Sequence, residues 1–172
     1  MYLVDTNVIS AGAPSKTVSA DELLKWMDEH STKLYLSVVT VTEIEDGIAK
    51  ARRERARRKA TDLTSWLETL LHLYGNRVLP FDVACARDAG ELLDLARSRG
   101  LGPGFADIVI AATARCHQLT ILTRNVRHFA PLGVLTINPF RSCRHNRHAS
   151  QRAAYPADSV TSCLALLLMP IS

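Results

Sequence analysis

Residues 34–48, LYLSVVTVTEIEDGI, combine the two patterns that decide the fold. The first part is apolar, β-branched and aromatic, which predicts a strand over residues 34–39. Thr40 or Thr42 can then cap a helix that runs to about residue 51. A strand that passes directly into a helix is the repeating unit of α/β proteins, so the fold depends on whether this unit recurs.

The same alternation does recur on both sides of this stretch. Strands are predicted at residues 2–4, 77–81, 119–123 and 134–137, and helices at 18–30, 52–74, 83–99 and 106–117. A turn or short helical piece is expected at 124–131. This order predicts an α/β fold with a mostly parallel central sheet.

The composition limits the classes of protein that this chain can belong to. Its 172 residues are enough for one domain, and 47% apolar with 22% charged residues is typical of globular proteins. Disordered, collagen-like and disulfide-scaffold classes are therefore excluded. The net charge of +4 lies mostly in residues 141–172, which carry four Arg and one Asp. We therefore expect a nearly neutral domain over residues 1–140 and a basic, poorly ordered tail over 141–172.

The cysteines and the two ends of the sequence indicate the cellular compartment in which the protein is expected. The four cysteines have no C-x-x-C or zinc-type spacing, and Cys85 and Cys116 are expected to be buried free thiols. Free thiols fit a reducing cytoplasm. The first ten residues lack the pattern of a signal peptide, and the apolar run at 163–171 is too short to cross a membrane. We therefore expect a cytoplasmic protein without a membrane partner.

Three acidic residues are predicted where strands pass into helices. Asp5 ends the first strand, Glu43 lies in the first turn of the helix after residues 34–39, and Asp107 lies in the first turn of an Ala-rich helix. Ligands of open α/β sheets bind at the carboxyl ends of the strands. Clustered carboxylates repel one another unless a cation offsets their charge. Oxygen ligands favour Mg²⁺ or Mn²⁺, which activates water and polarises phosphoryl oxygens.

Each acid also has a purely structural interpretation. Asp5 can cap the following turn, and Glu43 and Asp107 can interact with a helix dipole. Taken singly, these roles are commoner than metal binding. The placement of all three at strand-to-helix junctions is what favours a site.

Five motifs in order resemble the PIN-domain ribonucleases, and within them the VapC-type toxins of the FitB-like branch. They are MYLVDTNVIS, LYLSVVTVTEIEDGI, DIVIAATA, LTILTRNVRHF and INPF, and they extend from residue 1 to residue 140. The resemblance implies a three-layer α/β/α fold and a Mg²⁺- or Mn²⁺-dependent endoribonuclease acting on RNA. It also implies an antitoxin partner and a homodimer.

The resemblance also implies roles for individual residues. The matching acids are Asp5, Glu43 and Asp107, which would bind the metal. Thr6 and Asn7 match the polar residues beside the first acid and would shape the strand end and contact substrate. Thr123 and Asn125 match the end of the fourth strand, where Asn125 would orient a water molecule held by the metal.

The chain departs from the family pattern after that strand. PIN domains usually carry a fourth acid there, and this sequence has Asn125 and His128 at the two places where it occurs. Asn brings a carbonyl oxygen without charge, and neutral His suits Mn²⁺ better than Mg²⁺. Binding of one metal ion is the expectation, and binding of two is left open.

Arginines supply the candidate contacts to RNA phosphates. Arg124 and Arg127 lie beside the predicted site, and the alternative is that they are ordinary surface residues. A basic run at 52–59 can contact RNA or an antitoxin, or can be a solvated helix face. In the second half of the same predicted arm, an apolar stripe predicts packing in the core; its members are Trp66, Leu67, Leu70 and Leu71.

Two other functions remain open at this point. One is a degenerate domain that binds antitoxin or RNA without cleaving, since the fourth acid is missing. The other is a different α/β phosphoryl-transfer enzyme with a nucleophile at Asp5. The D-T-N motif lacks the second Asp expected of that class, and no Gly-rich phosphate loop follows the first strand.

Overall fold

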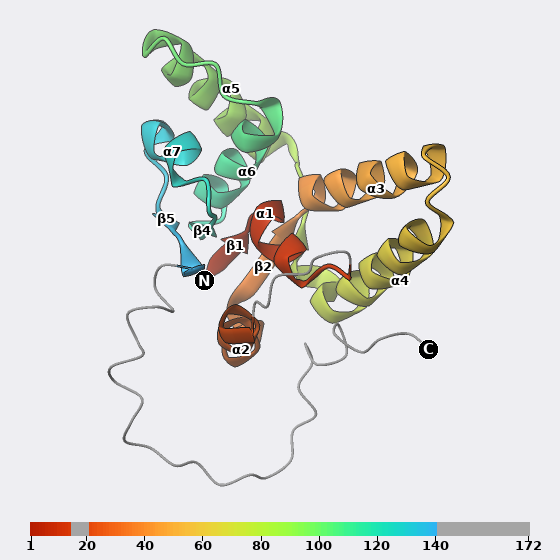
Figure 1. The fold of residues 1–172 in the computed structure, drawn as a ribbon. Helices are drawn as coiled ribbons and strands as arrows, with labels where there is room; N and C mark the ends of the chain where they lie inside the picture. The colour runs from red at the N-terminus through yellow and green to blue at the C-terminus, as the bar shows by residue number, and fades with distance from the viewer. Residues whose placement is uncertain (15–20, 141–172) are drawn as a thin grey trace, which may run out of the picture.

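The computed structural model describes residues 1–14 and 21–140, in which strands and helices alternate (Figure 1). The strands are β1 (Tyr2–Val4), β2 (Leu34–Ser37), β3 (Val78–Leu79), β4 (Thr120–Leu122) and β5 (Thr136–Ile137). The α-helices are α1 (Thr6–Ile9), α2 (Asp21–Glu29), α3 (Val38–Arg53), α4 (Arg57–Tyr74), α5 (Val83–Ser98), α6 (Phe105–Cys116) and α7 (Val126–Phe129).

The five strands form one sheet in the order β3-β2-β1-β4-β5, and every pairing is parallel. This confirms the predicted parallel α/β sheet. From β1 the chain first builds outward through β2 and β3, and later returns to add β4 and β5 on the other side. The strand order therefore reverses between β1 and β4, which is where open α/β sheets bind their ligands.

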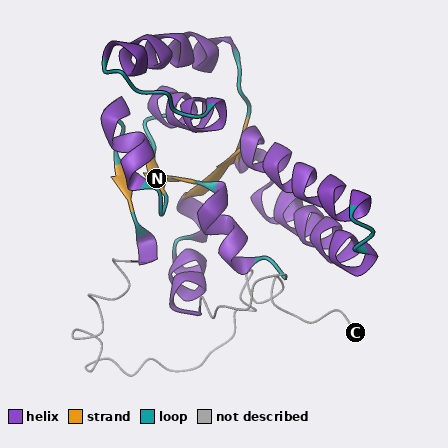
Figure 2. Ribbon diagram, turned by 45° about the horizontal axis from the view of Figure 1, so that its top comes forward, coloured by secondary structure: helices purple, strands orange, loops and turns teal. Residues whose placement is uncertain are grey.

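Helices cover both faces of the sheet, so the fold has three layers (Figure 2). On β1 and β4, Leu3 and Ile121 belong to the core under α5 and α6, whereas Val4 and Leu122 belong to the core under α1 to α4. Successive side chains of a strand point to opposite faces, so one apolar strand serves two cores. The predicted three-layer α/β/α arrangement is confirmed.

The strand predicted at residues 34–39 is two residues too long, and its predicted cap is wrong. β2 ends at Ser37, and α3 begins at once because the Ser37 hydroxyl accepts a hydrogen bond from the Val39 amide at 3.2 Å. Thr40 and Thr42 therefore lie inside the helix. Glu43 lies in the second turn of α3, not in the first as predicted.

The helical arm consists of α3 and α4, which turn back on each other at residues 54–56. Arg55 has a φ of 60°, a left-handed conformation that ends α3. Of the predicted apolar stripe on α4, Trp66, Leu67 and Leu70 are buried in the core, and Leu71 packs against it. The stripe is therefore a core element, as predicted.

Several expectations concern parts of the chain outside the described residues. The start of the helix predicted at 18–30 lies partly within 15–20, and the predicted tail begins at residue 141. Among the helices that the structure describes, none combines the length and apolar character that crossing a membrane requires.

Candidate active site

Asp5 lies at the carboxyl end of the central strand and is almost fully buried, with 6% of its surface exposed. Its backbone continues the ladder with β4, because its amide donates to the Leu122 carbonyl at 3.0 Å. Its own carbonyl accepts from the Val8 amide at 2.9 Å and so starts α1. The residue is therefore fixed by both the sheet and the helix, and its carboxylate faces the end of β4.

Thr123 connects Asp5 to the end of β4. Its Oγ1 donates to Oδ2 of Asp5 at 2.6 Å and accepts from Nδ2 of Asn7 at 3.1 Å and from the Asn125 amide at 2.9 Å. A hydroxyl has one donor and two acceptor positions, so all three are used. The direction of the Thr123 proton toward Asp5 is thereby fixed.

Asn7 completes this arrangement from α1. Its Nδ2 also donates to Oδ2 of Asp5, and its Oδ1 accepts from the Arg124 amide at 3.0 Å. Arg124 returns to the same residue, because its Nη2 donates to the Asn7 carbonyl at 2.8 Å. The ends of β1 and β4 are thus joined by side chains.

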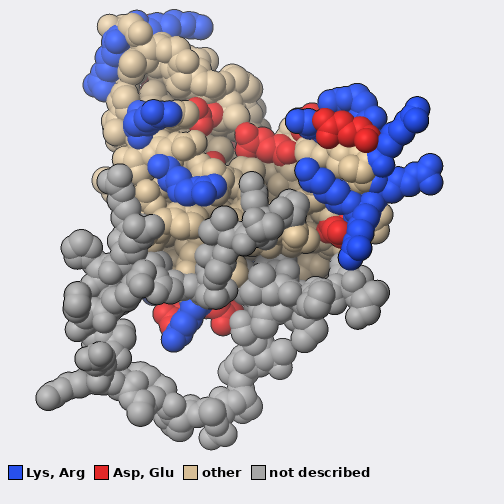
Figure 3. All heavy atoms as spheres, viewed as in Figure 1, with Lys and Arg blue, Asp and Glu red and all other residues tan. Residues whose placement is uncertain are grey.

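The structure brings Glu43 and Asp107 to the same end of the sheet as Asp5. Burial raises the pKa of Asp5, the hydrogen bond from Thr123 lowers it, and the charges of Glu43 and Asp107 raise it again. Glu43 is exposed on α3, and Asp107 is half-buried in the first turn of α6. Acidic side chains gather in the hollow between the α3–α4 arm and the α5–α7 side (Figure 3). Three carboxylates from three elements therefore converge.

The donor set fits a hard divalent cation, because it consists of oxygens and includes a buried carboxylate that repels its neighbours. Within the described part of the chain, one group of three possible metal ligands has its ligand atoms within 4.8 Å of one another, and it does not include these acids. The three carboxylates are therefore more widely spaced than that. Mg²⁺ keeps several waters when bound by carboxylates, so such spacing is compatible with that ion.

The sequence also matches the model of a known domain family. The model of the PIN domain matches residues 2–133. The chain belongs to the PIN-domain family. The match includes all three acids and every strand except β5.

This PIN domain is similar to individual relatives over nearly the whole length of those relatives. Toxin FitB of Neisseria gonorrhoeae is 34% identical, covering 81% of this chain and 99% of its own. The VapC ribonuclease Y4jK of Sinorhizobium fredii is 36% identical, covering 81% and 98%. The crystal structure of FitAcB from N. gonorrhoeae superposes with a TM-score of 0.71 at 34% identity, over 81% of this chain and 99% of that one.

His128 occupies one of the two places, with Asn125, where the resemblance to PIN domains leads us to expect a fourth acid. Its Nδ1 lies 3.1 Å from Oδ2 of Asp107, so it forms a direct contact with one of the three acids. The nearby Asn125 precedes α7, and its side chain makes no capping hydrogen bond there. The residue is exposed, and its backbone amide donates to Thr123 at 2.9 Å.

The remaining predicted substrate contacts have different surroundings. Arg124 and Arg127 are both exposed, but Arg124 is held by Asn7 and its guanidinium stacks 5.0 Å from the centre of the Phe140 ring. The Thr6 hydroxyl donates to Oγ1 of Thr40 at 3.1 Å and so ties α1 to α3. Thr6 is thus engaged within the fold rather than facing the acids.

The sequence did not predict the role of Thr123. It placed this residue at the strand end without assigning it a contact, and the structure makes it the centre of the hydrogen bonds around Asp5. The available signal was the position of Thr123. β4 lies beside β1, so the first residue after β4 faces the first residue after β1.

Proposed function

We propose that this PIN domain is a metal-dependent endoribonuclease that hydrolyses RNA phosphodiester bonds. The convergence of Asp5, Glu43 and Asp107 carries the proposal, because the burial of Asp5 beside two like charges is costly without a bound cation. The names of relatives that are similar over most of this chain, a VapC ribonuclease among them, support the same activity.

The three carboxylates would hold Mg²⁺ or Mn²⁺. A bound ion of this kind supplies Lewis-acid polarisation of a phosphoryl oxygen and lowers the pKa of water. Asp5 presents its ligand oxygens in a fixed orientation, since the bonds from Thr123 and Asn7 both end on Oδ2. Oδ1 receives neither of these bonds and is the better placed to bind the ion.

The other site residues would orient the attacking water and bind the RNA. Asn125 would direct its exposed amide group at the attacking water. Arg127, exposed next to the site, would contact a phosphate, and Arg124 would do so with the guanidinium nitrogens that Asn7 does not occupy. Asn7 and Thr6 would position the end of β1 for substrate, because their hydrogen bonds hold it in place.

The biological setting that we propose is a toxin–antitoxin pair. Toxin FitB is similar over nearly its full length, so a cognate antitoxin protein is the expected partner. The resemblance to the family adds a homodimer as the expected assembly. The chain would act in the cytoplasm on RNA. We assign the nuclease to residues 1–140, while residues 141–172 lie outside the described part.

Expression in a bacterial host tests this function. The wild-type chain should arrest growth, and Asp5→Asn should abolish the arrest at equal protein level. Asp28→Asn, on the distant α2, is the matched control and should remain toxic. Equal growth arrest by the Asp5→Asn variant would overturn the proposal.

A degenerate domain that binds RNA or antitoxin without cleaving is the second candidate. The observation that favours it is the contact of His128 with Asp107, where a fourth carboxylate is usual. Calorimetric titration with Mn²⁺ separates the two. The nuclease predicts binding that Asp5→Asn removes, and the degenerate domain predicts none.

A further inference from the structure

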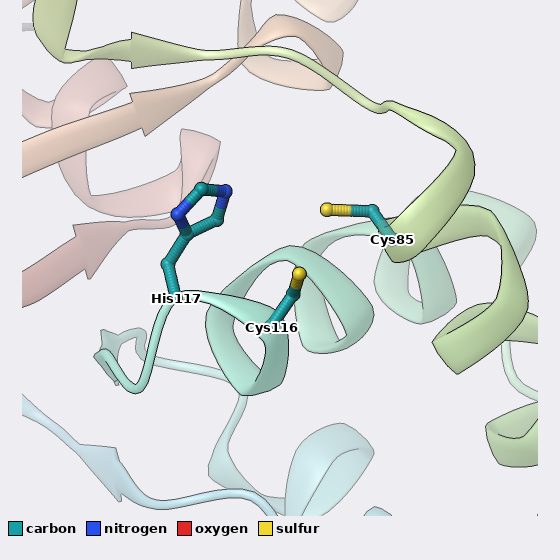
Figure 4. Close-up of side chains that lie close together, drawn as sticks. All are labelled: Cys85, Cys116 and His117. Atoms are coloured by element: carbon teal, nitrogen blue, oxygen red, sulfur yellow. The ribbon is translucent and has the colours of Figure 1, made fainter.

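Cys85, Cys116 and His117 form a second cluster of metal-ligating side chains, remote from the carboxylates. Cys85 comes from the first turn of α5, and the other two from the end of α6 and the residue after it. Their ligand atoms all lie within 4.8 Å of one another. In Figure 4 the Cys85 sulfur points toward the His117 ring, and the Cys116 sulfur points into the same space.

We propose that these three residues bind a zinc ion, or another soft divalent cation. Two sulfurs and one imidazole nitrogen are a usual zinc donor set, with a fourth ligand completing a tetrahedron. At a Zn–S distance of about 2.3 Å, two sulfurs on one tetrahedral ion lie about 3.8 Å apart. The two sulfurs therefore need to approach each other by about 1 Å at most.

Asp82 is a carboxylate near the cluster, outside the group of ligand atoms that lie within 4.8 Å of one another. It immediately precedes α5, where its Oδ1 accepts from the Cys85 amide at 2.9 Å. This hydrogen bond lowers the pKa of Asp82, and His117 contributes in the same direction. The carboxylate is thus close enough to His117 for their charges to interact. A carboxylate next to a metal-binding histidine is a recurrent arrangement in zinc proteins.

The helices that carry the cluster are fixed relative to one another. Arg115, next to Cys116, forms ion pairs with Asp88 at 2.9 Å and with Glu91 at 2.6 Å, and both acids lie on α5. The start of α5 and the end of α6 are therefore held together without the ion. A preorganised site of this kind loses less entropy on binding than a flexible one.

This site is separate from the proposed nuclease centre. His117 precedes β4 and Thr123 follows it, so the length of the strand lies between them, at about 3.3 Å per residue. Sulfur and imidazole select soft ions, whereas the carboxylates select Mg²⁺ or Mn²⁺. The two sites therefore take different ions and are tested independently.

Titration with Co²⁺ is the test, because thiolate ligands give Co²⁺ a charge-transfer absorption band and tetrahedral geometry gives it intense d–d bands. The experiment uses the full chain under a reductant, with Cys143→Ser and Cys163→Ser to remove the other thiols. We expect the thiolate band to saturate at one Co²⁺ per chain, with the tetrahedral d–d bands, and Zn²⁺ to abolish both signals. The absence of the thiolate band overturns the proposal.

Variants assign the ligands. Cys85→Ser and Cys116→Ser should each lower the charge-transfer intensity by about half. His117→Gln, at an exposed position that tolerates substitution, should weaken Co²⁺ binding by at least about tenfold even where the cysteine variants fail to fold. Asp5→Asn should leave the spectrum unchanged. Equal affinity in His117→Gln, or loss of the band in Asp5→Asn, contradicts the assignment.

Discussion

Nδ1 of His128 lies 3.1 Å from Oδ2 of Asp107, at the position where PIN domains usually carry a further acid. The contact joins α7 to the first turn of α6. It replaces what would be a repulsion between two carboxylates by a hydrogen bond. In this chain, one of the three converging acids therefore has a partner that needs no metal.

His128→Asp should reverse this relationship. The new carboxylate faces Asp107, so we expect the melting temperature of the metal-free protein to fall, because like charges at close range repel. Added Mn²⁺ should recover the loss and bind more tightly than in the wild type. Differential scanning fluorimetry with and without Mn²⁺ measures both effects. His128→Asn, which adds no charge, is the control, and an identical response of the two variants would contradict this account.

Thr123→Val should destabilise the protein by about 1–3 kcal/mol, because it removes the hydrogen bond donated to the buried Asp5 and the one accepted from Asn7, at nearly constant volume. Chemical denaturation measures the free energy of unfolding. Thr123→Ser retains the hydroxyl and should lose less than half as much. Equal losses in the two variants would show that the methyl group, and not the hydroxyl, is what matters.

Asp5→Asn should stabilise the metal-free protein at neutral pH. The pKa of Asp5 is raised by burial, so the folded state binds its proton more tightly than the unfolded state. The cost of ionising Asp5 is absent below the ordinary pKa of 3.8 and grows as the pH rises through the raised value. The melting temperature of the variant should therefore exceed that of the wild type at pH 7, with the difference vanishing toward pH 3. A variant less stable at pH 7 would contradict the cause given for the shift.

Arg127→Ala should affect RNA binding without affecting the fold. The residue is exposed, so the free energy of unfolding should change by less than about 0.5 kcal/mol. Losing one phosphate contact should reduce the slope of log K against log salt by about 0.7 for single-stranded RNA. Fluorescence anisotropy at several salt concentrations measures this slope. An unchanged slope would mean that Arg127 is an ordinary surface residue.

Periodicity was sufficient to predict most of the architecture. The apolar runs at residues 2–4 and 119–123 were recognisable as strands, and β1 and β4 lie there. The end of β2 was misplaced because Val38 and Val39 are β-branched and suggested a longer strand, whereas the Ser37 hydroxyl begins the helix. A local hydrogen bond outweighed the intrinsic propensity of the two valines.

The sequence predicted which acids converge, but not how they are connected. The bond from Thr123 to Asp5 spans 118 positions and exists only because β1 and β4 are neighbours. The same holds for Cys85, which lies far from Cys116 and His117 along the chain. Motif spacing cannot reveal such a cluster. Its member Cys116, expected to be buried, is half-buried.

The decisive measurement of metal-dependent nuclease activity is cleavage of RNA by the purified full-length chain. A fluorescently labelled RNA is incubated with the wild type and with Asp5→Asn, in Mn²⁺ and in EDTA. We expect cleavage by the wild type in Mn²⁺ alone, and a rate at least about 100-fold lower for the variant, more than outer-shell changes usually cost. Cleavage by Asp5→Asn at the wild-type rate, or wild-type cleavage undiminished by EDTA, would contradict a nuclease centred on Asp5.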